Sequence, residues 1–194
     1  NRNGTLDFFN FDLESDAGRV SAPGTLKAEA TIQSARFKGT FDQAQSLLEI
    51  ENASFDFGEK GSLYLPLPVN HLLPIRALSI SAKYWLGPEI FEVEKLIADL
   101  DGPRVVARGV IQEIAGEMGF ELNATAFQLE MDSLDAYWPA EIGGVPREWV
   151  LKKISKGIVT RARAKMSGRW NGTDGISTDM LIGDMDFNDM TIDY

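Results

Sequence analysis

The sequence predicts an all-β protein with one short helix, in which an antiparallel meander of strands forms a curved, groove-like or partly closed sheet. Two observations predict this fold class. Short segments with apolar side chains at every second position recur along the chain, and most end in a turn rich in glycine, proline or aspartate. One stretch, residues 135–157, has the features of a helical insertion between strands. We therefore expect a single elongated β-rich domain over residues 1–194.

Size and composition exclude several classes of protein. The 194 residues carry a net charge of −10, which argues against binding nucleic acid through its phosphates. There is no cysteine, so the chain has no disulfide, thiolate metal site or cysteine nucleophile. No run approaches the roughly 20 apolar residues that a membrane-spanning helix needs. Because the sequence has no initiator Met and ends in a strand-like run, we expect it to be a fragment of a longer chain.

Several predicted strands have one face made of apolar side chains. The pattern is clearest over residues 25–33, 78–84, 120–126 and 160–166, where apolar residues alternate with others. Many of the apolar positions are alanine, which leaves room above the sheet. The side chains predicted to form this apolar wall are Leu26, Ala28, Ala30, Ile32, Leu78, Ile80, Ala82, Phe120, Leu122, Ala124, Ala126, Ala162, Ala164 and Met166.

A strand with one apolar face must cover that face with something. About a dozen strands at the usual spacing would be roughly 55 Å wide, which one short helix cannot cover. Three covers remain: a second sheet as in a sandwich, the same sheet curled on itself, or an apolar ligand. From the residues alone, packing against the protein's own side chains is the commoner use of such a face.

Two segments are predicted to be loops. Three prolines between residues 66 and 74 cannot sit inside a sheet ladder, so we expect residues 68–74 to form a loop. Residues 168–175 contain two turn signals and are expected to form a hairpin loop.

Just before this hairpin, the alternation after residue 157 predicts a strand with a basic, solvent-exposed face. That face is expected to consist of Val159, Arg161, Arg163 and Lys165.

The helix is predicted from its start and stop signals. Pro146 follows a Gly-Gly break and suits a first helical position, because its missing N–H costs nothing there. Val150 and Ile154 lie one turn apart and give the helix an apolar stripe. Lysines gather toward the negative end of the helix dipole, and Gly157 suits the left-handed conformation that ends a helix. We therefore expect the helix to begin at Pro146 and to be closed at Gly157.

The segment around this helix carries the most specific pattern of the sequence. It reads YWP over residues 137–139 and PREWVLKKISKGIVTRARAKM over residues 146–166. Aromatic residues beside a proline turn and a short helix can bind a ligand, but they more often hold the helix on the sheet. We expect this structural role for the motif residues Tyr137, Trp138, Pro139 and Trp149.

These residues resemble the central region of the YhdP-type AsmA-like proteins, in which a Tyr-Trp-Pro turn precedes an Arg-Trp helix and a strand that starts after glycine. The match covers residues 137–166 well. The remaining strands resemble the family only in that their segments end in glycine. The resemblance implies a segment of a large envelope protein of a Gram-negative bacterium. Such a protein lies in the periplasm and is attached to the inner membrane by an anchor elsewhere in the full-length chain.

The resemblance also implies a function, because AsmA-like proteins are thought to build long β-grooves with an apolar concave wall. The expected function is phospholipid transport between the inner and outer membranes in support of outer-membrane integrity. Phospholipid acyl chains would bind along the groove, with envelope proteins as candidate partners, no cofactor and no catalysis. The alternative is a structural β-sandwich scaffold of the envelope that binds no lipid and fills its interior with its own side chains. An envelope hydrolase is a third hypothesis.

Signals for catalysis or metal binding are weak. His71 is the single histidine, and it lies among prolines without the acid and serine pattern of a catalytic triad. The acids at positions 184–189 resemble the start of a calcium loop, but Asp189 stands where such a loop needs glycine. Their alternation with Met185 and Phe187 favours a solvent-exposed strand face. We therefore expect no catalytic residue and no metal site.

Overall fold

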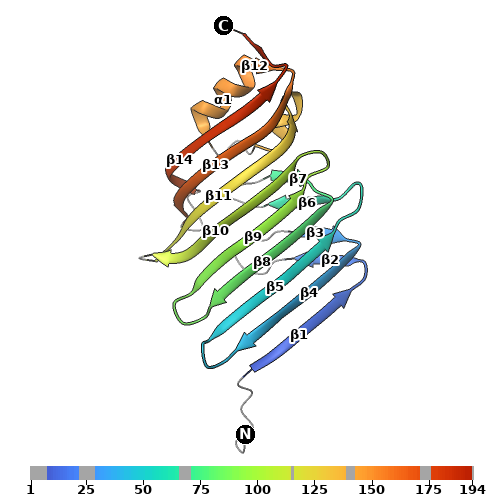
Figure 1. Cartoon of the computed structure of the whole chain (residues 1–194), viewed down its shortest axis with the longest axis vertical. Coiled ribbons are helices and arrows are strands. Elements are labelled where there is room, and N and C mark those ends of the chain that lie inside the picture. The colour runs from blue at the N-terminus through green and yellow to red at the C-terminus, as the bar shows by residue number, and fades with distance from the viewer. Residues whose placement is uncertain are drawn as a thin grey trace, which may run out of the picture.

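A nine-stranded antiparallel sheet forms the body of the protein (Figure 1). The structure is a computed structural model that describes residues 8–21, 29–65, 71–114, 116–138, 143–170 and 176–193. The sheet is open, and its strands follow one another in chain order, which confirms the predicted antiparallel, all-β fold class. Its strands are β1 (Phe8–Ser15), β4 (Ser34–Asp42), β5 (Leu47–Asp56), β8 (Ala77–Trp85), β9 (Ile90–Asp99), β10 (Arg104–Ile114), β11 (Glu117–Glu130), β13 (Ile158–Trp170) and β14 (Ile176–Asn188).

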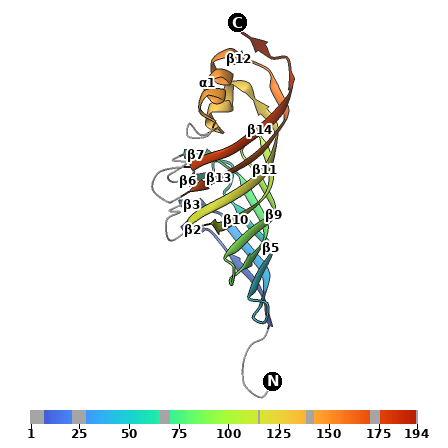
Figure 2. The same cartoon turned by 90° about the vertical axis from the view of Figure 1, so that its left-hand side faces the viewer.

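Three excursions interrupt this meander. The first two contribute a four-stranded sheet of order β2-β3-β6-β7, and the third contributes a 3₁₀ helix, an α-helix and a short strand that pairs with the end of the chain. All of these elements lie on the same side of the large sheet (Figure 2). They are β2 (Gly18–Ser21), β3 (Glu29–Ile32), β6 (Ser62–Leu65), β7 (His71–Pro74), η1 (Met131–Ala136), α1 (Gly144–Lys153), β12 (Ile154–Ser155) and β15 (Thr191–Ile192).

The three excursions all leave the large sheet from one end of its strands. They connect β1 to β4, β5 to β8, and β11 to β13, and we call this end the cover rim. At the opposite end, the turn rim, short connections join β4 to β5, β8 to β9, and β10 to β11. In Figure 1 the turn rim runs along the left side of the sheet. The excursions therefore fold back over the part of the sheet that lies nearest the cover rim.

Two hydrophobic clusters hold the excursions on the sheet. The first joins the four-stranded sheet to the middle strands of the large sheet, and Ile75, which is 1% exposed, lies in it between β7 and β8. The second joins η1 and α1 to β11, β13 and β14 around Val159, which is 0% exposed. Tyr137 packs against both clusters and so links them.

The segment around the prolines departs from the prediction. Residues 71–74 form β7, which pairs with β6 from Ser62↔Pro74 to Leu65↔His71, so the expected loop over residues 68–74 is wrong in this half. Pro74 is tolerated because β7 is an edge strand and Pro74 is its last residue, where no further ladder bond is lost. Residues 66–70 lie outside the described residues.

The helix departs from the prediction at both ends. It begins at Gly144, two residues before Pro146, because Gly143 and Gly144 take positive φ angles of 86° and 33°. Pro146 still lies in the first turn, where backbone N–H groups have no helical partner. The helix ends at Lys153, since Ile154 already pairs with Ile192 of β15. Gly157 is left-handed, with a φ of 77°, but it turns the chain from β12 into β13 and does not close the helix.

The strand after Gly157 contains a β-bulge that the sequence pattern did not predict. The register between β13 and β14 shifts between Val159 and Arg161, so the two side chains fall on opposite faces. Val159 is therefore buried in the second cluster, not exposed beside Arg161, Arg163 and Lys165 as expected.

The hairpin loop expected over residues 168–175 begins later than predicted, because residues 168–170 still belong to β13, which ends at Trp170.

Candidate functional site

Lateral pairing across the nine strands places apolar side chains in four rows on the face that carries the excursions. The two rows nearest the turn rim, the turn-side rows, begin at Phe9 and Phe11 of β1. The first consists of Phe9, Phe41, Leu48, Tyr84, Phe91, Ile111, Phe120, Gly168 and Thr178. The second consists of Phe11, Gly39, Ile50, Ala82, Val93, Gly109, Leu122, Met166 and Leu181.

The two rows nearer the cover rim, the cover-side rows, complete this surface, which we call the apolar wall. The third row consists of Leu13, Phe37, Ala53, Ile80, Leu96, Ala107, Ala124, Ala164 and Gly183. The fourth consists of Ser15, Ala35, Phe55, Leu78, Ala98, Val105, Ala126, Ala162 and Met185. No side chain in the four rows carries a charge. The apolar wall is therefore uncharged from one edge strand of the sheet to the other.

The opposite face of the same strands is covered with charges. Arg36 of β4 bridges Asp12 at 2.8 Å and Glu14 at 3.1 Å, both on β1. At the other edge, Arg161 and Arg163 of β13 pair with acids of β14. The hydrogen bond from Arg36 lowers the pKa of the Asp12 carboxyl, as an exposed carboxylate beside a guanidinium requires. The large sheet thus has one polar face and one apolar face, as expected for a sheet in which only one face contacts water.

Packing covers the apolar wall unevenly. The first cluster takes in side chains of the cover-side rows such as Ala35, Leu78 and Ala98, and the second takes in Ala162 and Met185. Among the described residues, neither cluster includes a side chain of the turn-side rows.

Exposed large side chains occur along the turn-side rows: Phe9 is 43% exposed, Ile111 is 37% exposed and Leu181 is 39% exposed. Exposure is not confined to these rows, since Leu13 of the third row is 59% exposed and Ala82 of the second row is buried. Scattered single apolar residues on a surface need no explanation, but a continuous uncharged stretch across nine strands does. The turn-side rows are therefore the candidate functional site.

Glycines in the turn-side rows make room for aromatic rings. Phe11 lies directly opposite Gly39, and a Cβ on Gly39 would come within 2.6 Å of Phe11 Cζ. Phe120 lies opposite Gly168 in the same way, with 2.9 Å from its Cζ to the position of a Cβ. Each ring therefore covers the backbone of the neighbouring strand, and the surface between the strands is lined by ring atoms.

Replacing Gly39 with alanine is expected to lower the free energy of unfolding by about 1 to 3 kcal/mol, because the new methyl group overpacks the Phe11 ring and the Glu49 carbonyl. Urea unfolding followed by circular dichroism measures this change. Gly87→Ala is the matched control, since a Cβ on Gly87 meets nothing within 4 Å. Equal stability of the two variants would show that Phe11 does not lie against Gly39.

The structure brings together most of the side chains predicted for the wall. Those of β8, β11 and β13 all lie in the four rows: Leu78, Ile80, Ala82, Phe120, Leu122, Ala124, Ala126, Ala162, Ala164 and Met166. Ala30 and Ile32 do not, because they belong to β3 of the four-stranded sheet and are buried in the first cluster beneath it. Leu26 and Ala28 lie outside the described residues.

The motif residues around the helix have different surroundings. Tyr137 and Trp138 pack against the second cluster, and the Trp138 carbonyl accepts a 2.8 Å hydrogen bond from Arg147 Nε of α1. Partial burial raises the pKa of the Tyr137 hydroxyl, with Asp101 and Glu130 adding to the effect. Trp149 does not hold the helix on the sheet, since its side chain is 53% exposed. Pro139 lies outside the described residues.

Sequence reasoning missed the aromatic first row as a unit. Phe9, Phe41, Tyr84 and Phe91 come from four strands, and their alignment depends on the register of three different pairings. Phe9 and Phe41 lie close, with ring centroids 5.6 Å apart. The alternation within each strand indicates which side chains share a face. It does not give the register between strands, which is what aligns the four rings.

The other candidate residues have structural partners. His71 Nε2 lies 2.6 Å from the Ala136 carbonyl oxygen, which links β7 to η1. Asp184 and Asp186 accept hydrogen bonds from Arg163 and Arg161. Within the described parts of the chain, no group of three or more histidine, cysteine or acidic side chains could hold a metal ion.

Two depressions of about 540 and 440 Å³ are lined mainly by side chains of the polar face, including Arg36 in one and Arg108 in the other.

None of the helices in the described residues is both long enough and apolar enough to span a bilayer. Compared with known proteins, the chain matches no family model, no curated protein and no solved structure.

Proposed function

We propose that this chain is a segment of an AsmA-like periplasmic protein whose apolar wall holds phospholipid acyl chains on their way between the inner and outer membranes. The observation that carries the proposal is the contrast between the two faces of the large sheet. One face is uncharged across nine strands and only partly packed, while the other is covered with ion pairs. The resemblance of residues 137–166 to the YhdP-type AsmA-like proteins points to the same function.

The direction of the rows suits a path for an acyl chain. Rows run across the strands, so nine strands at about 4.8 Å spacing give a path of roughly 40 Å from β1 to β14. A tail that lies along the turn-side rows gains about 0.8 kcal/mol for each CH₂ removed from water and meets no charge on the way. The head group stays at the turn rim, where the short connections leave it in water.

Movement along such a path needs no chemistry. The protein's contribution is a continuous surface with similar affinity at each step, so a tail that slides from one strand to the next loses and gains comparable contacts. We therefore propose a role without catalysis or cofactor. In the full-length protein, an inner-membrane anchor elsewhere in the chain would hold this segment in the periplasm, with other envelope proteins as partners.

A structural scaffold is the second candidate, and the two hydrophobic clusters favour it. They show that most of the fourth row, together with Phe37 and Leu96 of the third row, is packed against the protein's own side chains. A scaffold would need the turn-side rows to be covered as well, by further protein. The two functions therefore differ in what covers the turn-side rows.

Solvent extraction of the purified protein separates these functions. Protein expressed in the envelope and purified without detergent is extracted with organic solvent, and lipid phosphorus in the extract is measured against protein. The lipid-holding role predicts phospholipid near or above one molecule per chain, in excess of that carried by an envelope protein of similar size. Extracts no richer in phospholipid than this reference would contradict the role and favour the scaffold.

A further inference from the structure

The smaller of the two depressions on the polar face gathers cations that have no acidic partner. Its volume is about 440 Å³, and it spans β9, β10, β11, β13 and β14. Lys95, Arg108 and Lys165 line it and are exposed, and none of the three forms an ion pair with a described residue. Because the whole chain has a net charge of −10, three cations without acidic partners at one place need an explanation.

The acids that line the same depression are already paired. Glu94 accepts an ion pair from Lys83 at 2.7 Å, and Asp184 accepts one from Arg163 at 2.6 Å. The charge of each acid is therefore matched by a cation other than the three described above.

The pairing of β13 with β14 shows where an acid is missing. Arg161 and Arg163 each face an acid of β14 directly across the strand pair. Lys165 is the next residue of β13 on this face, and it faces Ile182, which is 63% exposed. The position from which an acid would neutralise Lys165 thus holds an apolar side chain.

An amide lies between two of the three cations. Asn123 of β11 faces Arg108 of β10 on one side and Lys165 of β13 on the other. At about 4.8 Å for each step between strands, the backbones of the two cationic residues are roughly 10 Å apart. Both side chains are long enough to meet above Asn123, whose amide NH₂ group is a hydrogen-bond donor. The three side chains can therefore donate to one ligand at the same time.

Two further acids lie close to the depression but outside it. Glu92 and Glu121 both face Val110, one row nearer the turn rim than Arg108, and neither lines the depression. Neither forms an ion pair with a described residue. An anion held over Asn123 would therefore contact cations on both sides and no unpaired acid.

We infer that this depression binds a phosphate group, either inorganic phosphate or the phosphate of a lipid head group. The guanidinium of Arg108 can donate two parallel hydrogen bonds to phosphate oxygens, and the Lys165 ammonium adds a second positive charge. A phosphate group has enough oxygens to accept from three donor side chains, whereas a carboxylate has only two. The site lies on the face opposite the apolar wall, so the inference goes beyond the lipid-holding role.

A nuclear magnetic resonance titration of the ¹⁵N-labelled whole chain tests the inference. Inorganic phosphate is one ligand, and glycerophosphoglycerol, the water-soluble head group of phosphatidylglycerol, is the other. Binding predicts a saturable shift of the Asn123 side-chain amide signals that the same concentration of sodium chloride does not cause. The ligand that binds more tightly identifies the source of the phosphate group. Absence of a saturable shift with both ligands would overturn the inference.

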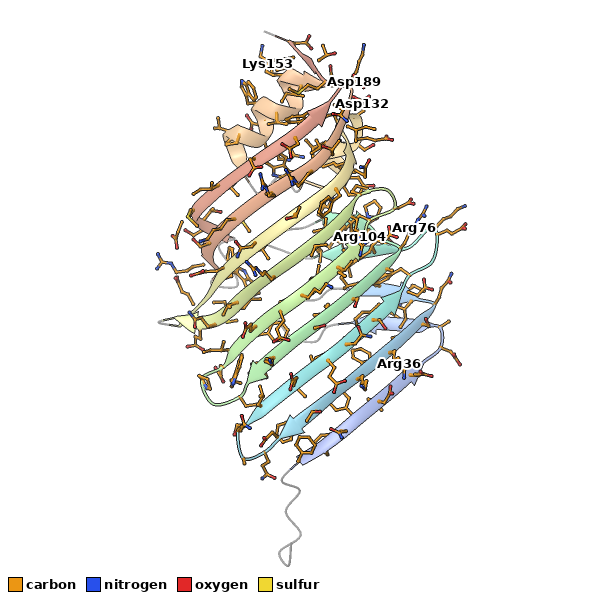
Figure 3. All side chains as sticks on the ribbon, viewed as in Figure 1. Arg36, Arg76, Arg104, Asp132, Lys153 and Asp189 are labelled. Carbon is orange, nitrogen blue, oxygen red and sulfur yellow. The ribbon has the colours of Figure 1, made fainter. Side chains whose placement is uncertain are left out.

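Variants show whether the free cations make the contact. Arg108→Gln and Lys165→Gln are each expected to weaken binding on the order of tenfold, since each removes charge-assisted hydrogen bonds. Arg36→Gln is the matched control, because Arg36 is an exposed cation of the same face but is paired with Asp12. It lies on β4, far from β13 along the sheet (Figure 3). Equal binding by all three variants would overturn the inference.

The phosphate site and the lipid-holding role are tested separately. Arg108→Gln leaves the turn-side rows intact, so protein with this change should yield as much phospholipid on solvent extraction as the unaltered chain. Its urea midpoint should also match, because Arg108 is exposed. Loss of phosphate binding with unchanged extracted lipid would support the site, and unchanged phosphate binding would overturn it whatever the extraction yields.

Discussion

Replacing Ile75 with alanine is expected to lower the free energy of unfolding by about 2 to 5 kcal/mol. Ile75 is 1% exposed and sits in the first cluster, between the four-stranded sheet and the large sheet. Its removal leaves a cavity that the backbone cannot close, because the Ile75 N–H is bonded to the Gly61 carbonyl and its neighbour Arg76 is bonded to Asp99. The first cluster would thus lose its most buried side chain.

Urea unfolding with linear extrapolation measures this change. Leu72→Ala is the matched control: it removes a similar side chain from β7, three residues away, where the leucine is 60% exposed. We expect this control to change stability by less than about 1 kcal/mol. A similar loss in both variants would mean that the four-stranded sheet is not packed on the large sheet through Ile75.

Replacing Leu122 with lysine is expected to reduce the phospholipid carried by the protein by at least about tenfold. Leu122 lies near the middle of the second row, between Gly109 of β10 and Met166 of β13. An acyl chain on this row would bring hydrocarbon against an ammonium group and displace its water. That contact costs more than the 1.4 kcal/mol that corresponds to a factor of ten. Lipid phosphorus after solvent extraction gives the measurement.

The protein itself should tolerate this change, because Leu122 is half-buried and belongs to neither cluster. Its long apolar stem lets a lysine at this position cover the sheet and keep its charge in water. Ile182→Lys is the control, since it puts the same charge on the polar face of β14, opposite Lys165. A folded Leu122→Lys protein that carries as much phospholipid as Ile182→Lys would contradict the proposed function.

The strand faces were predictable from the sequence because the period of two is a local property. Leu78, Ile80 and Ala82 alternate with polar or small neighbours, and any strand built from this segment must place them on one face. Antiparallel pairing then joins the apolar faces of neighbouring strands, since a shift by one residue would turn a whole strand over. The uncharged surface follows from these two facts.

The cover of this surface was not predictable, because it depends on long-range packing. The alternation over residues 25–33 predicts a strand but not the sheet it joins, and β3 pairs with β6 across about thirty residues of sequence. Ala30 and Ile32 look like wall residues in the sequence but lie in the covering sheet. The bulge beside Val159 was missed for a related reason: one extra residue reverses the face of a side chain without changing its local pattern.

The acids of the edge strands bear on how this protein avoids self-association. Within the described residues, β1 and β14 end the sheet, and both leave one side of their backbone free to accept another strand. Asp12 and Glu14 stand on one of these strands, and Asp184 and Asp186 on the other. These acids are paired with arginines of the neighbouring strands, Arg36 on β4 and Arg161 and Arg163 on β13, so each edge strand carries charged side chains along its polar face. Charged side chains on an edge strand disfavour pairing with a second strand, because the added strand would have to accommodate them. The sheet can therefore keep a large apolar surface while its edges disfavour strand-to-strand association.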